Sequence, residues 1–263
     1  MSKTKIPWAT DSWNPVVGCS KVSAGCENCY AEAMNKRFHW IKDWNTPEFF
    51  PERLKKLNAK QKPKTIFVCS TSDLFHEDVK YAWIYQVVEK IIECKQHTFM
   101  FLTKRPLRMK AVFETLRDDL SFDKLSNLWL GVTAENQEMA NKRIPILLDI
   151  PAAKHFVSLE PMLGELDLSI LKPSKAMGLN ALSGVRYDLV TYSQGKALDF
   201  VIVGCESGRS RRKCKDEWVQ RIINDCKYYK TPLMIKQLEQ NGKLVHSPFF
   251  EGKQYLDFPK TEE

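Results

Sequence analysis

The sequence predicts an α/β fold built on a parallel sheet, and three observations support this prediction. Short runs of consecutive apolar residues recur along the 263-residue chain, stretches with helical spacing lie between them, and the two kinds alternate at least five times. Parallel strands that helices cover on both faces are continuously apolar, whereas half-exposed strands alternate. Regular alternation of strand and helix is typical of a β/α arrangement with a parallel sheet.

Six segments have the composition of buried strands. The first, residues 65–70, follows a linker rich in lysine and proline. The others are residues 98–103, 128–132, 155–159, 200–204 and 233–235. Each is short and rich in β-branched, aromatic or other apolar residues, which favours an extended conformation.

Helical patterns fill the intervals between these strands. They cover residues 79–95, 135–148 and 216–229, and a further helix over 26–40 is expected to begin inside a cysteine motif. In the third pattern, five apolar residues share one stripe, as on a helix that packs against a sheet. These residues are Trp218, Val219, Ile222, Ile223 and Cys226.

Two segments depart from the alternation. Residues 172–197 contain serine, glycine and asparagine among scattered apolar residues, so we expect an insertion or a hairpin there. Residues 241–263 are polar with a few aromatic residues and are expected to form a tail that packs on or near the main domain. The predicted organisation is therefore one domain over residues 1–240, followed by this tail.

The composition is that of a globular protein with a basic excess. Hydrophobic residues make up 43% of the chain, charged residues 27%, and the net charge is +8. The sequence has no apolar run of the roughly 20 residues that a membrane span needs, and its first ten residues lack a signal core. We therefore expect a cytoplasmic protein, with its cysteines reduced and no membrane partner. The charge indicates either a polyanionic partner such as DNA or RNA, or a solvated lysine-rich surface.

Polar and charged residues follow each predicted strand directly. In β/α folds, the carboxyl ends of the strands carry the functional site, so these residues are candidates for a shared binding site. The alternative is that they only form turns and helix caps. The candidates are Ser70, Thr71, Asp73, Lys104, Arg105, Thr133, Glu135, Glu160, Gly204 and Glu206.

Three cysteines near the start of the chain are the most informative motif. Cys19, Cys26 and Cys29 have the spacing C-x6-C-x2-C, and the next cysteine is Cys69. Three thiolates can hold a 4Fe–4S cluster and leave the fourth iron open for a small molecule. They can equally hold zinc, with Cys69, Cys205 or a histidine as the fourth ligand. Spacing alone does not decide between these metals.

Seven sequence runs, taken in order, resemble the phage-associated three-cysteine-motif family. They are residues 13–19 (WNPVVGC), 25–32 (GCENCYAE), 72–76 (SDLFH), 102–106 (LTKRP), 128–132 (LWLGV), 158–161 (SLEP) and 201–208 (VIVGCESG). That family is similar to radical S-adenosylmethionine (SAM) enzymes such as spore photoproduct lyase. The usual radical SAM spacing is C-x3-C-x2-C, so the first gap is longer here, and Cys205 stands where the family usually has a second glycine.

The resemblance implies a partial (β/α)6-type barrel, a 4Fe–4S cluster on Cys19, Cys26 and Cys29, and SAM as the cosubstrate. It also implies an electron donor such as flavodoxin or ferredoxin. By position, Ser70, Thr71 and Asp73 would contact the methionine amino group, and Lys104 or Arg105 would hold its carboxylate. Glu135 or Glu160 would meet the ribose, and Gly204 would let adenine approach the backbone. The implied reaction is hydrogen abstraction from a nucleobase or nucleotide, such as a modified pyrimidine in phage DNA, or from a small metabolite.

Two further residues are candidates for a catalytic role. His76 could donate a proton or bind substrate, because the pKa of histidine lies near neutrality; the alternative is a structural histidine that caps the next helix. Cys205 could quench a substrate radical by donating the hydrogen of its weak S–H bond. The alternative is that Cys205 is a small buried hydrophobic residue.

Two basic segments could line a groove for a polyanion. One is the run of basic residues over 209–213, and the other covers residues 36–64, where aromatic side chains that could stack on bases are interleaved with lysine and arginine. The alternative is a surface whose aromatic residues pack on the domain. A zinc-stabilised nucleic-acid-binding protein without catalysis is therefore the main competing hypothesis.

Overall fold

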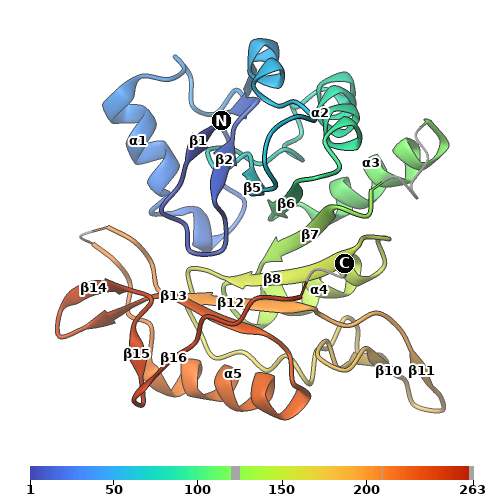
Figure 1. The fold of residues 1–263 in the computed structure, drawn as a ribbon. Helices are drawn as coiled ribbons and strands as arrows, with labels where there is room; N and C mark the ends of the chain where they lie inside the picture. Colours follow the sequence, from blue (N-terminus) through green and yellow to red (C-terminus); the bar gives the residue numbers. More distant parts are fainter. Residues whose placement is uncertain (120–124, 209, 261–263) are drawn as a thin grey trace. The chain divides into compact units, whose positions relative to one another are not determined.

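The computed structural model describes residues 1–119, 125–208 and 210–260, which form two compact units (Figure 1). Unit 1 consists of Met1–Gly131 together with Ile150–Ala153. Unit 2 consists of Val132–Asp149 and Lys154–Glu263. Each unit has strands of the predicted parallel kind and helices, so the α/β class is confirmed, while the partial barrel stays a prediction.

Unit 1 contains a sheet in the order β1-β2-β5-β6-β7. Its strands are β1 (Ser2–Lys3), β2 (Asp11–Trp13), β5 (Thr65–Val68), β6 (Thr98–Thr103) and β7 (Leu128–Thr133), of which β7 continues into unit 2. β5 is parallel to both β2 and β6, with Ile66 opposite Asp11 and Phe99. The central strands are apolar and buried, as the sequence predicts. The carboxyl ends of β2, β5 and β6 therefore lie at one edge of this sheet.

The remaining elements of unit 1 include three helices and several short segments. The helices are α1 (Tyr30–Phe38), α2 (Tyr81–Glu93) and α3 (Pro106–Asp119), and the short segments are β3 (Val16–Val17), η1 (Ala24–Cys26), β4 (Glu48–Phe49) and η2 (Pro51–Lys56). α2 buries Ile84, Val87, Val88 and Ile91 on one face. The stripe expected from the sequence is Ala82, Trp83, Val87, Ile91 and Ile92, and of these only Val87 and Ile91 are buried. α3 is absent from the sequence prediction. It begins at a proline, a residue that the first turn of a helix tolerates.

Unit 2 contains a sheet in the order β8-β12-β13-β14. Its strands are β8 (Lys154–Leu159), β12 (Phe200–Gly204), β13 (Leu233–Gln240) and β14 (Lys243–His246), and its helices are α4 (Gln137–Leu148) and α5 (Asp216–Tyr229). β12 is parallel to β8 and to β13, whereas β14 returns antiparallel to β13. Figure 1 draws α5 below β12 and β13 in this unit. The predicted bounds of α5 and β12 are confirmed.

Residues 172–197 form the predicted insertion in unit 2. It is a small antiparallel sheet of β9 (Gly178–Leu179), β10 (Val185–Tyr187) and β11 (Tyr192–Gln194), in the order β11-β10-β9. A second hairpin, β15 (Phe249–Phe250) with β16 (Lys253–Gln254), lies in the segment predicted as a tail. The division of the chain at residue 240 stays a prediction. No helix within the described ranges combines the length and the apolar composition needed to cross a membrane.

Candidate functional site

The three cysteines of the motif lie in one segment of unit 1 that follows β3. Cys26 ends η1, and Cys29 is the residue that precedes α1. The helix predicted over 26–40 therefore begins at Tyr30, because Cys29 has an extended backbone (φ −64°, ψ 118°). All three cysteines have free thiols and are partly exposed.

Gly18 fixes the entry to this segment. Its φ is +103°, in the region that favours glycine, and a Cβ atom there would lie 2.8 Å from Ile41 Cδ1 and 3.0 Å from Pro47 Cα. The next amide, of Cys19, donates to the carbonyl of Trp44 at 2.9 Å. The loop after α1 therefore packs directly against the start of the cysteine segment.

Arg105, at the carboxyl end of β6, connects the first cysteine to two carboxylates. Its guanidinium donates to Asp73 Oδ2 at 3.2 Å and to both Glu77 oxygens at 3.0 and 2.9 Å. It also donates to Cys19 Sγ at 3.6 Å and to the Ser20 carbonyl and hydroxyl at 3.1 and 3.0 Å. Arg105 is buried, so these partners compensate its charge. Its hydrogen-bonding groups are already used within the chain.

Asp73 is the acceptor at the centre of this network. Its carboxylate accepts from the Thr103 hydroxyl at 2.7 and 2.8 Å, from the Lys104 amide at 3.1 Å and from the Phe75 amide at 3.0 Å. The amine of Lys104 itself is half-buried and makes no ion pair among the described residues. Lys104 and Arg105 were both predicted to hold the SAM carboxylate. Only Lys104 has a charge that is not already paired with a carboxylate of the described residues.

Ser70 and Thr71 follow β5 at the same edge. Ser70 Oγ donates to Asn14 Oδ1 at 3.1 Å, and the Thr71 amide donates to the same oxygen at 3.3 Å. Thr71 Oγ1 is buried without a hydrogen-bond partner in the structure. A buried hydroxyl without a partner is costly, so Thr71 Oγ1 has hydrogen-bonding capacity left for a water molecule or a ligand.

His76 is buried in the turn before α2, and hydrogen bonds occupy both of its ring nitrogens. Its Nδ1 accepts from the Asp78 amide at 3.1 Å, so Nε2 carries the proton and lies 2.7 Å from Ser20 Oγ. Burial, followed by the nearby Arg105 charge, lowers the pKa of His76. The ring is therefore neutral near pH ~7 and ties the cysteine segment to this turn. Its catalytic role stays a prediction.

The surroundings of Cys19 favour its thiol form over the thiolate. Burial, followed by the negative charge of Asp73, raises the pKa of Cys19 to about 12, although Arg105 acts in the opposite direction. Burial likewise raises the pKa of Cys69 to about 12. Cys69, one of the possible fourth ligands for zinc, is fully enclosed in unit 1.

The cysteine donors fit a three-cysteine cluster in kind and number. Three free thiols in one segment are soft donors, and they suit an iron–sulfur cluster or zinc. Among the described residues, no three Cys, His, Asp or Glu side chains are grouped so that they could hold a metal ion. The segment from Cys19 to Cys29 would therefore have to draw together around a bound metal.

A second set of predicted residues gathers in unit 2, where β7 and β8 end. Glu135 is fully buried and accepts from Arg143 Nη1 at 2.8 Å, and the same nitrogen donates to the Thr133 carbonyl at 2.8 Å. A buried carboxylate needs such a partner. The carboxylate predicted to meet a ribose is thus engaged with an arginine of α4.

Glu160 fills the space beside Gly204 at the end of β12. A Cβ atom on Gly204 would lie 2.5 Å from Glu160 Oε1. Glu160 Oε2 accepts from the Ser158 hydroxyl at 3.1 Å, and Lys236 Nζ lies 2.9 Å from Oε1. The latter contact is an ion pair. Gly204 therefore allows a carboxylate, rather than a side chain of its own, to occupy this point.

Cys205 and Glu206 continue from β12. Cys205 is buried, which raises its pKa to about 11, and its backbone is bonded in both directions to Gln237 of β13, at 3.0 and 2.8 Å. Glu206 accepts from Arg212 Nη2 at 2.6 Å and Nε at 3.1 Å. Neither the radical-quenching role of Cys205 nor the cofactor contact of Glu206 is tested by this geometry, and both stay predictions.

Several side chains of the basic and aromatic segments contact other residues of the chain. Phe49 stacks on Trp83 with ring centroids 5.3 Å apart, and Arg53 lies 3.9 Å from the ring of Phe50. Arg211 pairs with Glu239, and Arg209 lies outside the described residues. These contacts match the packing alternative for the residues involved, while binding to a polyanion stays a prediction.

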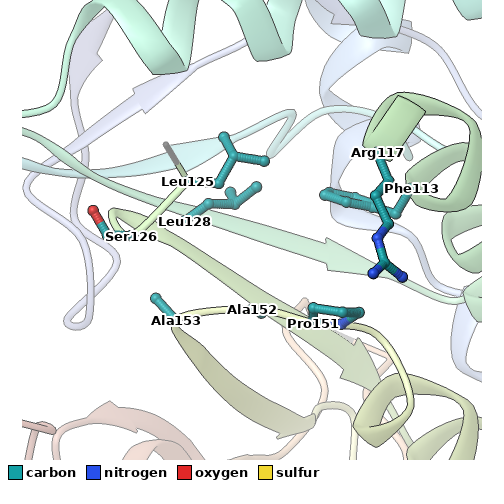
Figure 2. A pocket seen from close by; sticks show the side chains of 8 residues that line it. All are labelled: Phe113, Arg117, Leu125, Ser126, Leu128, Pro151, Ala152 and Ala153. Carbon is teal, nitrogen blue, oxygen red and sulfur yellow. The ribbon is translucent and has the colours of Figure 1, made fainter. Parts of the chain in front are cut away.

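A cavity of about 360 Å³ lies in unit 1, at the end of β7 opposite to its carboxyl end. Figure 2 shows the lining residues, with the Arg117 side chain extending from α3 towards the loop at Pro151. Phe113, Leu125 and Leu128 make most of it apolar. Because the predicted site residues of unit 1 lie at the carboxyl ends of its strands, this cavity is separate from the candidate site.

Three members of the unit 1 network are missing from the sequence prediction: Asn14, Ser20 and Glu77. Ser20 directly follows Cys19, and Glu77 directly follows His76. Their position next to predicted site residues was the feature of the sequence that could have identified them. Asn14 lies in the run 13–19 but accepts from residues more than fifty positions away. Spacing along the chain cannot reveal such a contact.

The fold and the site define a class of α/β protein with a partly exposed cysteine triplet beside an arginine–carboxylate network. A family described as "Protein of unknown function (DUF5131)" matches residues 3–257, nearly the whole chain. The chain belongs to this family. No curated protein and no solved structure matches it.

Proposed function

We propose that this protein is a radical SAM enzyme whose cluster is held by Cys19, Cys26 and Cys29. The observation that carries the proposal is the position of the three free thiols. They are free and lie in a segment that Arg105 and His76 tie to the carboxyl ends of the parallel strands. Binding at that edge is the general rule for parallel α/β sheets. The proposal includes the partial barrel and the similarity to the phage-associated three-cysteine-motif family.

The residues of unit 1 divide the work as follows. A 4Fe–4S cluster, when bound, would supply the electron that cleaves SAM. Arg105 positions Cys19, and the available amine of Lys104 binds the SAM carboxylate. Thr71 Oγ1, which has no partner in the chain, receives a hydrogen bond from the methionine amino group.

The proposed substrate is a nucleobase or nucleotide, such as a modified pyrimidine in phage DNA. The net charge of +8 supports this choice, because a basic chain attracts a polyanion. A flavodoxin or ferredoxin in the cytoplasm would deliver the electron.

Anaerobic reconstitution with iron and sulfide tests the proposal. The filled protein should be brown, absorb near about 400 nm, and form 5′-deoxyadenosine when SAM and dithionite are added. The variants Cys26→Ala and Cys29→Ala should lose the absorbance and the product. Cys214→Ala, which removes another partly exposed cysteine outside the motif, should keep both.

A colourless protein with one zinc per chain would contradict the proposal and favour the zinc-stabilised nucleic-acid-binding alternative. So would a fully loaded cluster that forms no 5′-deoxyadenosine, either alone or with DNA. In that case the cysteines would serve a structural role.

A further inference from the structure

The insertion in unit 2 exposes an unusual number of apolar side chains. Leu189 and Val190, in the turn between β10 and β11, are 89% and 90% exposed. Tyr187 of β10 and Tyr192 of β11 are also exposed, and so are Met177, directly before β9, and Ile170, which precedes the insertion. Figure 1 shows the hairpin projecting at the margin of unit 2. Apolar groups gathered in this way mark an interaction surface.

The tip of the hairpin is held in one conformation. Asp188 Oδ1 accepts from the amides of Val190 at 2.8 Å and Thr191 at 2.7 Å, and Oδ2 accepts from the Thr191 hydroxyl at 3.0 Å. The Asp188 amide closes the turn on the Thr191 carbonyl at 3.0 Å. An aspartate that bonds the backbone two residues ahead is a common turn device. Leu189 and Val190 are therefore presented by an ordered turn, which lowers the entropy cost of binding.

The two tyrosines lie on one face of the hairpin. Tyr187 pairs directly with Tyr192 across the strands, so their side chains point to the same side. Tyr187 packs closely on Gly178, where a Cβ atom would lie only 2.1 Å from its ring. Tyr192 is 84% exposed. One ring is thus fixed against the sheet, while its neighbour offers an open aromatic face.

The segment that carries this apolar tip has an excess of positive charge. Residues 170–197 contain four basic residues and one acidic residue, a net charge of +3. Lys172, Lys175 and Lys196 are exposed, and Arg186 pairs with Asp149 at 2.6 Å. The acidic residue is Asp188, whose carboxylate is occupied by the turn. The charge presented outward is therefore cationic.

We propose that the β10–β11 hairpin is a wedge that enters double-stranded DNA. Leu189 and Val190 insert at a base step, Tyr192 stacks on an unstacked base, and the three lysines contact phosphates. Apolar side chains inserted between base steps are a known mode of duplex binding, and aromatic rings stack on bases without regard to sequence. A protein partner fits less well, because a tip two side chains wide is far smaller than a standard interface.

This inference deepens the proposed function by naming duplex DNA as the substrate class. Its test uses the full chain without cluster or SAM, so its result is independent of radical chemistry. The probe is a fluorescein-labelled duplex of about two helical turns, with a TA step and 2-aminopurine beside it. Binding is followed by anisotropy and base unstacking by 2-aminopurine fluorescence.

The wild-type chain should bind this duplex with salt-dependent affinity and increase the 2-aminopurine signal. The double variant Leu189→Ser/Val190→Ser should bind about tenfold more weakly and lose the signal increase, with an unchanged salt slope. Replacing Lys172 and Lys175 with glutamine should instead reduce the slope. Leu107→Ser, which changes a leucine of α3 that is 70% exposed, is the matched control and should bind like wild type.

Far-UV circular dichroism establishes that each variant is folded, and Leu189→Ala/Val190→Ala provides a milder replacement if the serines perturb the turn. The proposal is overturned if the tip variants bind like wild type, or if wild type does not bind the duplex at low salt. It is also overturned if light scattering shows that wild type is a dimer and the tip variants are monomers. The hairpin would then join two copies of the chain.

Discussion

Gly204 has no side chain, and this leaves room for a carboxylate among the polar residues at the ends of the unit 2 strands. The Glu160 carboxylate occupies the volume that a Cβ atom would need, at 2.5 Å, and it also contacts Lys236 and Ser158. Any larger residue at position 204 must displace this carboxylate. The position therefore constrains its neighbours as strongly as an ion pair does.

Gly204→Ala should lower the free energy of unfolding by about 1–3 kcal/mol, because an overpacked site must shift and the Glu160 contacts are lost. Urea unfolding measures this loss. Gly164→Ala is the control, since its Cβ would meet nothing closer than Asn136 Cβ at 3.5 Å. If the explanation is correct, the cost of Gly204→Ala should largely vanish in a Glu160→Ala background. A cost that persists there would point to another cause.

The surroundings of Asp225, on α5, disfavour the ionised form of its carboxyl group in the folded state. Its Oδ2 is buried without a hydrogen-bond partner. Burial, followed by the charge of Asp167, raises the pKa of Asp225, although Arg221 opposes this shift. A folded-state pKa above the unfolded value means that stability is greatest below the unfolded pKa and falls as the pH rises through the folded pKa.

Asp225→Asn should therefore stabilise the protein at about pH 7, by less than about 1 kcal/mol because solvent screens a partly exposed carboxylate, and the gain should shrink as the pH falls to about 4. Urea unfolding at both pH values measures this. Asp188→Asn should behave in the opposite way, because the amides of Val190 and Thr191 lower the pKa of Asp188. Its contribution is present above the unfolded pKa and disappears in acid. A destabilised Asp225→Asn at neutral pH would refute the assignment.

Residue types at the strand ends were predictable, but their partners were not. Lys104 and Arg105 are adjacent, and the sequence gives no reason to prefer either as the binding cation. In the structure, the Arg105 guanidinium donates its hydrogen bonds to Asp73, Glu77 and Ser20. This difference depends on side-chain directions at the end of β6, which a sequence pattern does not contain. The same holds for Glu135, whose partner Arg143 comes from the next helix.

At the scale of elements, the continuously apolar strands were the most predictable feature. β5, β6, β8 and β12 appear where the sequence places them, because burial on both faces leaves an unmistakable apolar run. Their bounds shift by only a residue or two. The parallel pairing of β5 with β6 and of β8 with β12 follows the alternation with helices.

The elements that sequence reasoning missed have weaker apolar patterns. α3 has charged residues interspersed along its length, so its buried face through Met109, Val112, Phe113 and Leu116 was not recognised. β14 is short, has no fully buried residue, and is held by antiparallel pairing with the extended β13. In such a strand, tertiary pairing decides the structure more than local composition does.

At the scale of the whole molecule, the chain passes between the two units three times. It leaves unit 1 within β7, returns for Ile150–Ala153, and then enters unit 2 again. The returning segment is bonded to unit 1, where the Ala153 amide donates to the Leu128 carbonyl at 3.3 Å. Each unit is therefore built from two separate segments of the chain, and the segments of the two units alternate along the sequence.

This interleaving should make unfolding cooperative. Six of the seven tryptophans belong to unit 1, so tryptophan fluorescence reports mainly on that unit, whereas far-UV circular dichroism reports on both. In urea the two signals should give the same midpoint. Trp218→Phe makes fluorescence specific to unit 1 and should leave this agreement intact. Two separated midpoints would show that the units unfold independently.

The conformation of Gly18 has a consequence for experiments that randomise the cysteine motif. A residue with a side chain at this position would meet Ile41, Pro47 and the carbonyl of Trp44, and would have to adopt a backbone angle that L-amino acids avoid. A combinatorial library that includes codon 18 should therefore return glycine even under selection for soluble expression alone. Enrichment at that codon would report on how the polypeptide folds, and not on any chemistry of the neighbouring sulfurs.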